Sequence, residues 1–327
     1  MTRVLSGVQP SGEVHLGNYL GAFRPWVDHQ RENDAFYCVV DLHALSQDYD
    51  PLLLATRTLD TATGLLAVGL DPELCALFVQ SHVPEHPRLA WLLECTATFG
   101  ELGRMTQFKE KGRDSESVRV GLFTYPVLQA ADILLYDADS VPVGDDQRQH
   151  LELTRDLAIR FNHHYGDTFV VPRAAVPLVG ARVMDLQDPT RKMSKSVSSP
   201  LGTVLVFDSP EEIDRKVRKA VTDTETDVRY DPGSKPGVSN LLELLAAATG
   251  DNPAKLAVDY TSYGPLKADL SAALVELLAP VRQRYQELTS DPAYVVSVLA
   301  DGAAKAHAVA AATLERAMAA AGLLPPG

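Results

Sequence analysis

Cysteine is scarce in this sequence. The 327 residues include three, Cys38, Cys75 and Cys95, which stand far apart and form no Cys-x-x-Cys pair. An odd, scattered set does not have the pattern of a disulfide framework or a zinc site, and is typical of buried, reduced thiols. Because Cys38 and Cys75 lie inside apolar, strand-like runs, we expect both in the core.

Clear metal-ligand spacing is also lacking. His82 and His86 are four residues apart, as two ligands on one helix would be, but Pro84 stands between them. Proline disfavours the interior of a helix. We therefore predict no metal site.

Long apolar runs are missing. We find no run of about 18 apolar residues, the length that spans a bilayer, and the first residues lack the apolar stretch of a signal peptide. We expect a cytoplasmic protein with no membrane partner.

Positive charge is in deficit, with 30 basic and 43 acidic residues and a formal net charge of −13. This balance argues against a protein that coats nucleic acid nonspecifically. It says nothing about a local basic surface that could hold a single RNA.

Short β-rich runs alternate with helical patterns in the first half. Residues 3–8, 35–41 and 75–80 are typical of buried strands. Residues 17–31 and 51–68 are typical of helices, the second with Asp50 as its N-cap. The alternation predicts an α/β fold, a Rossmann-like doubly wound parallel sheet with ligands at the carboxyl ends of the strands.

The second half changes character. Residues 179–202 are rich in Gly, Pro and Ser, and the pattern beyond them is mostly helical. Ser209, Pro210 and Glu212 have the positions of a helix start with a capping box. Three more Leu- and Ala-rich stretches favour helices, at residues 241–248, 266–288 and 292–321. We expect a catalytic domain at 1–190, a mobile loop at 191–202, a mostly helical domain at 203–290, and a C-terminal helix within 291–327 that packs back toward the catalytic domain.

A glycine-containing segment, residues 6–18, follows the first predicted strand and opens the first predicted helix. Backbone N–H groups at a helix start favour a phosphate. Gly12 and Gly17 allow a close backbone approach, and His15 and Asn18 could present donors to a triphosphate. The alternative is an ordinary glycine-rich turn.

A second segment, Lys192-Met193-Ser194-Lys195-Ser196, lies in the loop-rich stretch. Two lysines three residues apart, among hydroxyls, suit a clamp for a polyphosphate. The alternative is a solvated basic loop.

Together the two segments resemble the signature pair of class I aminoacyl-tRNA synthetases. His15-Leu16-Gly17-Asn18 is similar to the family's His-Ile-Gly-His motif, with Asn in the last place, and residues 192–196 match its Lys-Met-Ser-Lys-Ser loop at every position. Further segments resemble bacterial tryptophanyl-tRNA synthetases over nearly the whole chain. They are residues 7–12, 100–102, 104–109, 130–134, 141–147, 220–223 and 235–237.

The resemblance implies a reaction and its partners. The expected substrates are L-tryptophan, ATP with Mg²⁺, and tRNA(Trp), and the expected assembly is a homodimer. The catalytic residues that it implies are His15, Asn18, Lys111, Lys192 and Lys195. The ATP-binding residues that it implies are Gln9, Pro10, Ser11, Gly17, Asn18, Gly144, Asp145, Asp146, Val183, Lys192, Met193, Ser194, Lys195 and Ser196.

Tyr125, Gln129 and Asp132 have helical spacing and would share one face. By the resemblance, Asp132 accepts the indole N–H, the one polar group of the tryptophan ring. The alternative is that Asp132 caps or pairs within its own domain. The resemblance also implies Gln9, His43, Tyr125, Gln129, Val141, Val143 and Gln147 as residues of the amino-acid pocket.

The sequence departs from the family at two places near that pocket. Gln129 stands where methionine is expected, and Leu5 where phenylalanine is expected. Both changes bear on selectivity and inhibitor sensitivity, and neither removes a group needed for chemistry.

Other functions are open on the sequence alone. A tyrosine-specific synthetase shares both motifs, a nucleotidyltransferase shares the first, and a non-enzymatic paralogue is the third option. Arg215, Lys216, Arg218 and Lys219 form a basic cluster that either contacts RNA or is a solvated helix face with Glu211–Arg215 and Glu212–Lys216 pairs.

Overall fold

The computed structural model describes residues 2–10, 13–111, 118–142, 147–175, 183–194 and 199–325. Its sheet consists of β1 (Thr2–Val8), β2 (Asn33–Val39), β3 (Cys75–Val79), β4 (Ser140–Pro142) and β5 (Arg173–Ala175). The strand order is β3-β2-β1-β4-β5, and every pairing is parallel. The predicted doubly wound sheet is confirmed, and its order reverses beside β1, where such folds bind nucleotides.

Both faces of the sheet are buried at β2 and β3, because alternate residues of these strands enter two separate cores. In β1 only Leu5 is buried, so the prediction of a buried strand at 3–8 is wrong about its burial. In β2, Tyr37 belongs to one core and Phe36 to the other. In β3, Leu77 and Phe78 divide in the same way. Successive side chains of a strand point to opposite faces, so the continuous apolar runs in the sequence reflect two covered faces.

Helices of the first half cover these faces. They are α1 (Leu16–Asn18), the π-helical η1 (Tyr19–Phe23), α2 (Arg24–His29), α3 (Asp41–Ala44), α4 (Pro51–Ala67), the 3₁₀ turn η2 (Gln80–His82), α5 (Glu85–Glu94), α6 (Phe99–Leu102), α7 (Thr106–Lys111), α8 (Val120–Leu135) and α9 (Arg148–Tyr165).

Local signals placed several of these elements well. Asp50 caps α4 by accepting from the Leu52 N–H at 2.9 Å. The helix predicted at 17–31 is the stretch α1–η1–α2, which contains a π-helical segment and ends at His29. The strand predicted at 35–41 is wrong at its end, because residues 41–44 form α3. Cys38 and Cys75 are buried as expected, whereas Cys95 is exposed.

The second half is helical, as the sequence pattern indicated. Its elements are the 3₁₀ turn η4 (Pro200–Gly202), α10 (Pro210–Lys219), α11 (Pro236–Thr249), α12 (Pro253–Leu256), the 3₁₀ turn η5 (Ala257–Asp259), α13 (Tyr263–Ser290) and α14 (Pro292–Ala320). Ser209 caps α10 by accepting from the Glu212 N–H. The Glu212 carboxylate, expected to complete the capping box, accepts from Arg215 instead.

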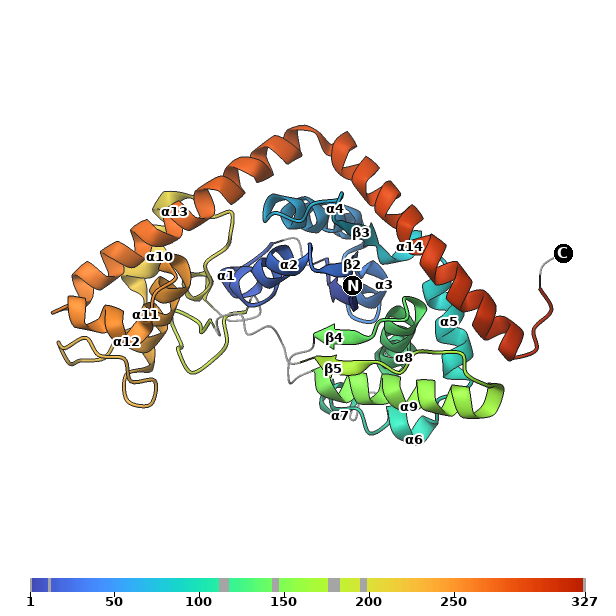
Figure 1. Cartoon of the computed structure of the whole chain (residues 1–327). Helices are drawn as coiled ribbons and strands as arrows, with labels where there is room; N and C mark the ends of the chain where they lie inside the picture. The colour runs from blue at the N-terminus through green and yellow to red at the C-terminus, as the bar shows by residue number, and fades with distance from the viewer. Residues whose placement is uncertain are drawn as a thin grey trace.

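The two longest helices join the two halves of the molecule. In Figure 1, α13 runs from the helical part to an apex, and α14 returns from there along β3 and α5. Within the described residues, α14 is long and apolar enough to cross a membrane by length and composition alone. Its apolar residues pack against β3, α5 and α8, and side chains such as Val295, Leu299 and Leu314 are buried there or near α13. These contacts bury 33% of the apolar stretch of α14.

The close approach of α14 to the edge strand gives a test of this packing. A Cβ on Gly302 would lie 1.9 Å from the carbonyl oxygen of Leu77 in β3. We expect Gly302→Ala to lower the free energy of unfolding by roughly 3 kcal/mol, because α14 would have to shift away from the backbone of β3. Urea unfolding followed by circular dichroism measures the effect.

Gly264→Ala is the matched control, since a Cβ on Gly264 at the start of α13 meets nothing within 4 Å. It should change stability by about 1 kcal/mol or less. Equal stability of the Gly302→Ala variant and the native chain would contradict this packing.

Candidate active site

The two signature segments, far apart in the sequence, lie in contact in the structure. The Leu16 N–H donates to the carbonyl oxygen of Val204 at 2.8 Å, so the first segment pairs with the chain that follows the lysine loop. Gly17 lies against Met193, whose Cβ would be 3.7 Å from a Cβ at position 17. Met193 is buried. The folding of the chain therefore places Lys192 beside the start of α1.

His15 turns its ring toward its own helix. Its Nδ1 accepts from the Asn18 N–H at 3.2 Å, and a Cβ on Gly17 would be 3.0 Å from the same nitrogen. A residue larger than glycine therefore does not fit under the ring without a shift. With Nδ1 as acceptor, the neutral imidazole carries its proton on Nε2. The Asn18 N–H also donates to the His15 carbonyl oxygen at 2.9 Å, so this backbone amide already has partners within its own turn.

The described part of the lysine loop is held by backbone pairing. Lys192 pairs with Met184 in an antiparallel bridge, and the Met193 N–H donates to the carbonyl oxygen of Val183 at 3.0 Å. The Ser194 carbonyl oxygen accepts from the Thr203 hydroxyl at 3.0 Å. The side chain of Lys192 is exposed. Its ammonium group is therefore at the surface, while the backbone that carries it is held in place by these hydrogen bonds.

Several predicted site residues lie outside the described part of the chain. They are Ser11, Val143, Gly144, Asp145, Asp146, Lys195 and Ser196, together with the side chain of Lys111.

A second group of polar side chains gathers around α8. Asp132 is buried, and its Oδ2 accepts from Nε2 of His43 at 2.7 Å. Its Oδ1 accepts from Nε2 of Gln80 at 2.7 Å and from Nδ1 of His86 at 2.6 Å. Burial alone would raise the pKa of Asp132, but attraction to the N–H groups of His43 and His86 and hydrogen bonds from them outweigh it and hold that pKa below its ordinary value. The carboxylate is therefore ionised and has partners within its own domain.

The other two predicted residues of that helix face contact the start of α9. The Tyr125 hydroxyl lies 2.7 Å from Nε2 of His150, and burial raises the pKa of Tyr125 to about 12. Nε2 of Gln129 donates to Oε1 of Gln147 at 3.1 Å. The ring of His43 meets the ring of Tyr125 edge-on, with centroids 6.2 Å apart. The structure thus brings five predicted pocket residues into one region.

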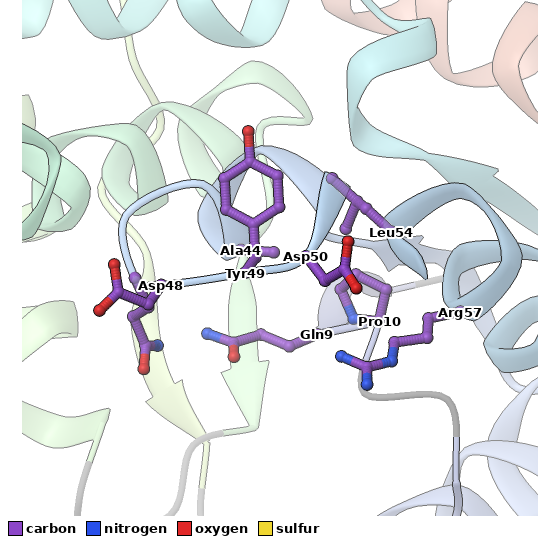
Figure 2. Close-up of a pocket in the computed structure, with 9 residues that line it drawn as sticks. Gln9, Pro10, Ala44, Asp48, Tyr49, Asp50, Leu54 and Arg57 are labelled. Carbon is purple, nitrogen blue, oxygen red and sulfur yellow. The ribbon is translucent and has the colours of Figure 1, made fainter. Parts of the chain in front are cut away.

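The remaining described residues lie on or near β1 and β4. Leu5 and Val141 are buried in the core that α8 covers. Gln9 and Pro10 follow the end of β1 and line a hollow of about 140 Å³ with the loop before α4 (Figure 2). In Figure 2 the side chain of Gln9 extends beneath the part of the loop that carries Tyr49. This hollow meets the predicted site only at Gln9 and Pro10.

Sequence reasoning missed Gln80, His86 and His150 as parts of this region. Gln80 follows the carboxyl end of β3, where polar residues of such sheets gather, and that position was an available signal. His150 is three residues beyond Gln147 and shares its helix face. In the sequence, His86 stands out only for its spacing from His82, which is that of two metal ligands on one helix. Among the described residues, no group of three His, Cys, Asp or Glu side chains is placed to hold a metal ion.

Comparison with known proteins decides the family. A family model described as tRNA synthetases class I (W and Y) matches residues 1–279. The chain belongs to this family. This class I tRNA synthetase is 57% identical over 332 residues to tryptophan–tRNA ligase 1 of Streptomyces coelicolor, with 100% of this chain and 98% of that protein covered. It is 52% identical to tryptophan–tRNA ligase of Mycobacterium leprae, with 99% and 97% covered.

Solved structures agree with the fold of this synthetase. Tryptophanyl-tRNA synthetase of Mycoplasma pneumoniae superposes with a TM-score of 0.89 at 38% identity, covering 99% of this chain and 98% of that chain. The enzyme of Campylobacter jejuni, complexed with ADP and tryptophan, gives a TM-score of 0.86 at 33% identity, covering 98% and 100%. The Rossmann-like sheet followed by helices is therefore the fold of these relatives.

Proposed function

We propose that this synthetase activates L-tryptophan with ATP as tryptophanyl-adenylate and transfers the tryptophanyl group to tRNA(Trp). It is an enzyme, a tryptophan–tRNA ligase of class I. The observation that carries the proposal is the contact between the His15–Asn18 segment and the Lys192–Ser194 segment, close to the end of the sheet where such folds bind nucleotides. The names of the relatives that match its full length support the choice of amino acid.

In the first step the carboxylate of tryptophan attacks the α-phosphorus of ATP, and the bond to pyrophosphate breaks. No side chain has to form a covalent intermediate, so the protein contributes position and charge. Nε2 of His15 donates to the phosphates, Asn18 and Gly17 lie beside them, and Lys192 balances charge on the departing pyrophosphate. Lys111 and Lys195 act with Lys192 by family resemblance.

Mg²⁺ fits this site as a companion of ATP and not as a resident ion. The described residues form no cage of ligands for a metal, and Mg²⁺ is commonly held by substrate phosphates, waters and one or two carboxylates. When bound, it offsets phosphate charge. Gly144, Asp145 and Asp146 contact the nucleotide by family resemblance, together with Val183, Met193, Ser194 and Ser196.

Tryptophan lies against α8, with its ring N–H donating to Asp132. Tyr125 and Gln147 hold the amino group, Gln9 lies near the carboxylate, and His43, Gln129, Val141 and Val143 line the pocket. A tyrosine-specific enzyme is the second candidate, because the matching family model covers both amino acids. Phenol offers a hydroxyl that both donates and accepts, whereas the indole N–H only donates and suits an ionised carboxylate.

ATP–pyrophosphate exchange, measured with each of the twenty amino acids in turn, tests the assignment. Exchange should depend on tryptophan and exceed the rate with tyrosine by several orders of magnitude. Exchange with tyrosine alone would overturn the proposal.

In the second step a ribose hydroxyl at the 3′ end of tRNA(Trp) attacks the carbonyl carbon of tryptophanyl-adenylate; the ester forms, the mixed-anhydride bond breaks and AMP leaves. The helices within residues 203–290 contact the anticodon in this proposal. Lys216 of the basic cluster is buried and pairs with Asp208 at 2.6 Å, so the solvated Glu212–Lys216 pair is wrong. Arg215 pairs with Glu212 and Arg218 with Asp214, which leaves Lys219 as the best candidate of the four for an RNA phosphate.

A cytoplasmic homodimer is the assembly that we propose. Trp91, Phe99 and Val120 are 66%, 82% and 75% exposed. They lie on α5, α6 and α8, and both α5 and α6 pack against α8. Large exposed apolar side chains on helices that pack together favour a protein interface. Trp91→Glu should shift the sedimentation coefficient from dimer to monomer at micromolar concentration.

The exposed residue Val258 supplies the control for this prediction. It is 83% exposed on η5, away from α5, and Val258→Glu should leave the sedimentation coefficient unchanged. A native chain that sediments as a monomer would contradict the proposed assembly.

A further inference from the structure

A buried chain of hydrogen bonds lies behind Asp132. His86 donates to Oδ1 of Asp132 through Nδ1 at 2.6 Å, and its Nε2 lies 2.9 Å from the hydroxyl of Tyr136. Gln80 reaches the same Oδ1 at 2.7 Å. The exposed fractions of Gln80, His86 and Tyr136 are all 0%, so these contacts do not compete with bulk water.

The direction of the hydrogen bonds follows from the chemistry of the groups. An ionised carboxylate only accepts, so Nδ1 of His86 carries a proton. In the neutral imidazole, Nε2 then accepts from the Tyr136 hydroxyl. Burial raises the pKa of Tyr136 and keeps that hydroxyl protonated. The hydrogen bonds therefore run from Tyr136 through His86 to Asp132.

The ring of His86 is fixed as well as paired. Its centroid lies 6.0 Å from that of Phe78 and 5.6 Å from that of Tyr136. A fully buried ring that packs against two aromatic neighbours turns only if the close-packed side chains around it move. The donor to Asp132 is therefore rigidly placed.

Most of the acceptor positions of Asp132 are already taken by its partners. A carboxylate offers about four lone-pair positions, two on each oxygen. Oδ1 accepts from both Gln80 and His86, so it is filled. Oδ2 accepts from His43. One position on Oδ2 is left for a donor from the substrate.

We propose that His86 is a positioning residue for amino-acid selection: with Gln80 it saturates Oδ1 and fixes the one remaining acceptor position of Asp132 on Oδ2, where it meets the ring N–H of tryptophan. The inference rests on the proposed function, because it assumes that Asp132 contacts the substrate. The alternative is that His86 only donates a hydrogen bond to the buried Asp132 carboxylate and affects stability alone.

The test uses a ratio that a merely structural role would not move. The kcat/KM for tryptophan is divided by that for benzothienylalanine, in which sulfur replaces the ring N–H, both from ATP–pyrophosphate exchange. The native enzyme should prefer tryptophan by roughly a thousandfold or more. His86→Gln moves the donor to the Nε2 position and should lower the ratio by roughly tenfold or more, mainly through the KM for tryptophan.

His86→Asn keeps a donor near the Nδ1 position and should retain the ratio within about threefold. The matched histidine control is His164→Gln on the exposed part of α9, which should have the native ratio. Gln80→Leu covers the case in which His86→Gln does not fold. It removes one donor to Oδ1 together with Oε1, a buried acceptor with no partner among the described residues, and should lower the ratio severalfold.

The outcomes separate the two proposals. A folded His86→Gln or Gln80→Leu enzyme with the native ratio overturns the positioning role. A native enzyme that accepts both amino acids equally, or does not use tryptophan, overturns the proposed contact of Asp132 or the proposed function, and the positioning role falls with it.

Discussion

Replacing Lys192 by alanine should lower the kcat of tryptophan-dependent ATP–pyrophosphate exchange by roughly 100- to 1,000-fold, with little change in the KM for tryptophan. Loss of one preorganised donor to a developing charge has an effect of this size. Lys192 fits the role because its backbone pairs with Met184 and its neighbour Met193 is packed beneath Gly17, while its own side chain is exposed. The charge acts when pyrophosphate departs, so kcat should fall more than substrate affinity.

Two variants make this experiment specific. Lys192→Arg keeps the charge and should retain more activity than the alanine variant, although a guanidinium group has a different shape. Lys255→Ala removes another exposed lysine, from α12 on the helical side of the molecule, and should have the native rate. A Lys192→Ala enzyme with the native kcat would refute the role of this ammonium group.

Asp132→Asn should raise the KM for tryptophan by roughly 100-fold and also lower the melting temperature. The carboxylate accepts from His43, Gln80 and His86. An amide has one oxygen and one NH₂ group, so in either orientation its NH₂ faces a donor and leaves buried groups unsatisfied. The substrate N–H loses its acceptor when the NH₂ lies at the Oδ2 position.

Tryptophan titrations of the exchange rate, together with thermal unfolding, separate the two effects. Asp301→Asn, an exposed position on α14, is the matched control and should change neither quantity. A lower melting temperature with a native KM would mean that Asp132 is a structural residue, the alternative that the sequence left open.

The two residues that depart from the family, Gln129 and Leu5, lie near the proposed amino-acid pocket and bear on its selectivity against inhibitors. Gln129, at the position where methionine is expected, donates to Gln147 at 3.1 Å. The departure therefore adds a hydrogen bond between α8 and the residue before α9. Leu5, the other departure, is buried in the core beneath α8 and does not present a polar group.

Local sequence signals were sufficient for most of the framework. The apolar runs of β1, β2 and β3, the cap of α4 at Asp50 and that of α10 at Ser209 each depend on a few consecutive residues. The three-residue strands β4 and β5 carry no such signal. Their strand character comes from pairing beside β1, which local patterning does not encode.

The amino-acid sequence by itself determined the parallel α/β sheet, the helical second half and the two motifs, because periodicity, capping residues and motif spacing are properties of short segments. The tertiary structure decided which groups meet. Asp132 has partners from α3, α5 and the residue after β3. Lys216, which the sequence placed on a basic surface, is instead buried and pairs with Asp208. Such contacts depend on how distant elements pack, because a buried charge is stable only beside the partners that packing brings to it.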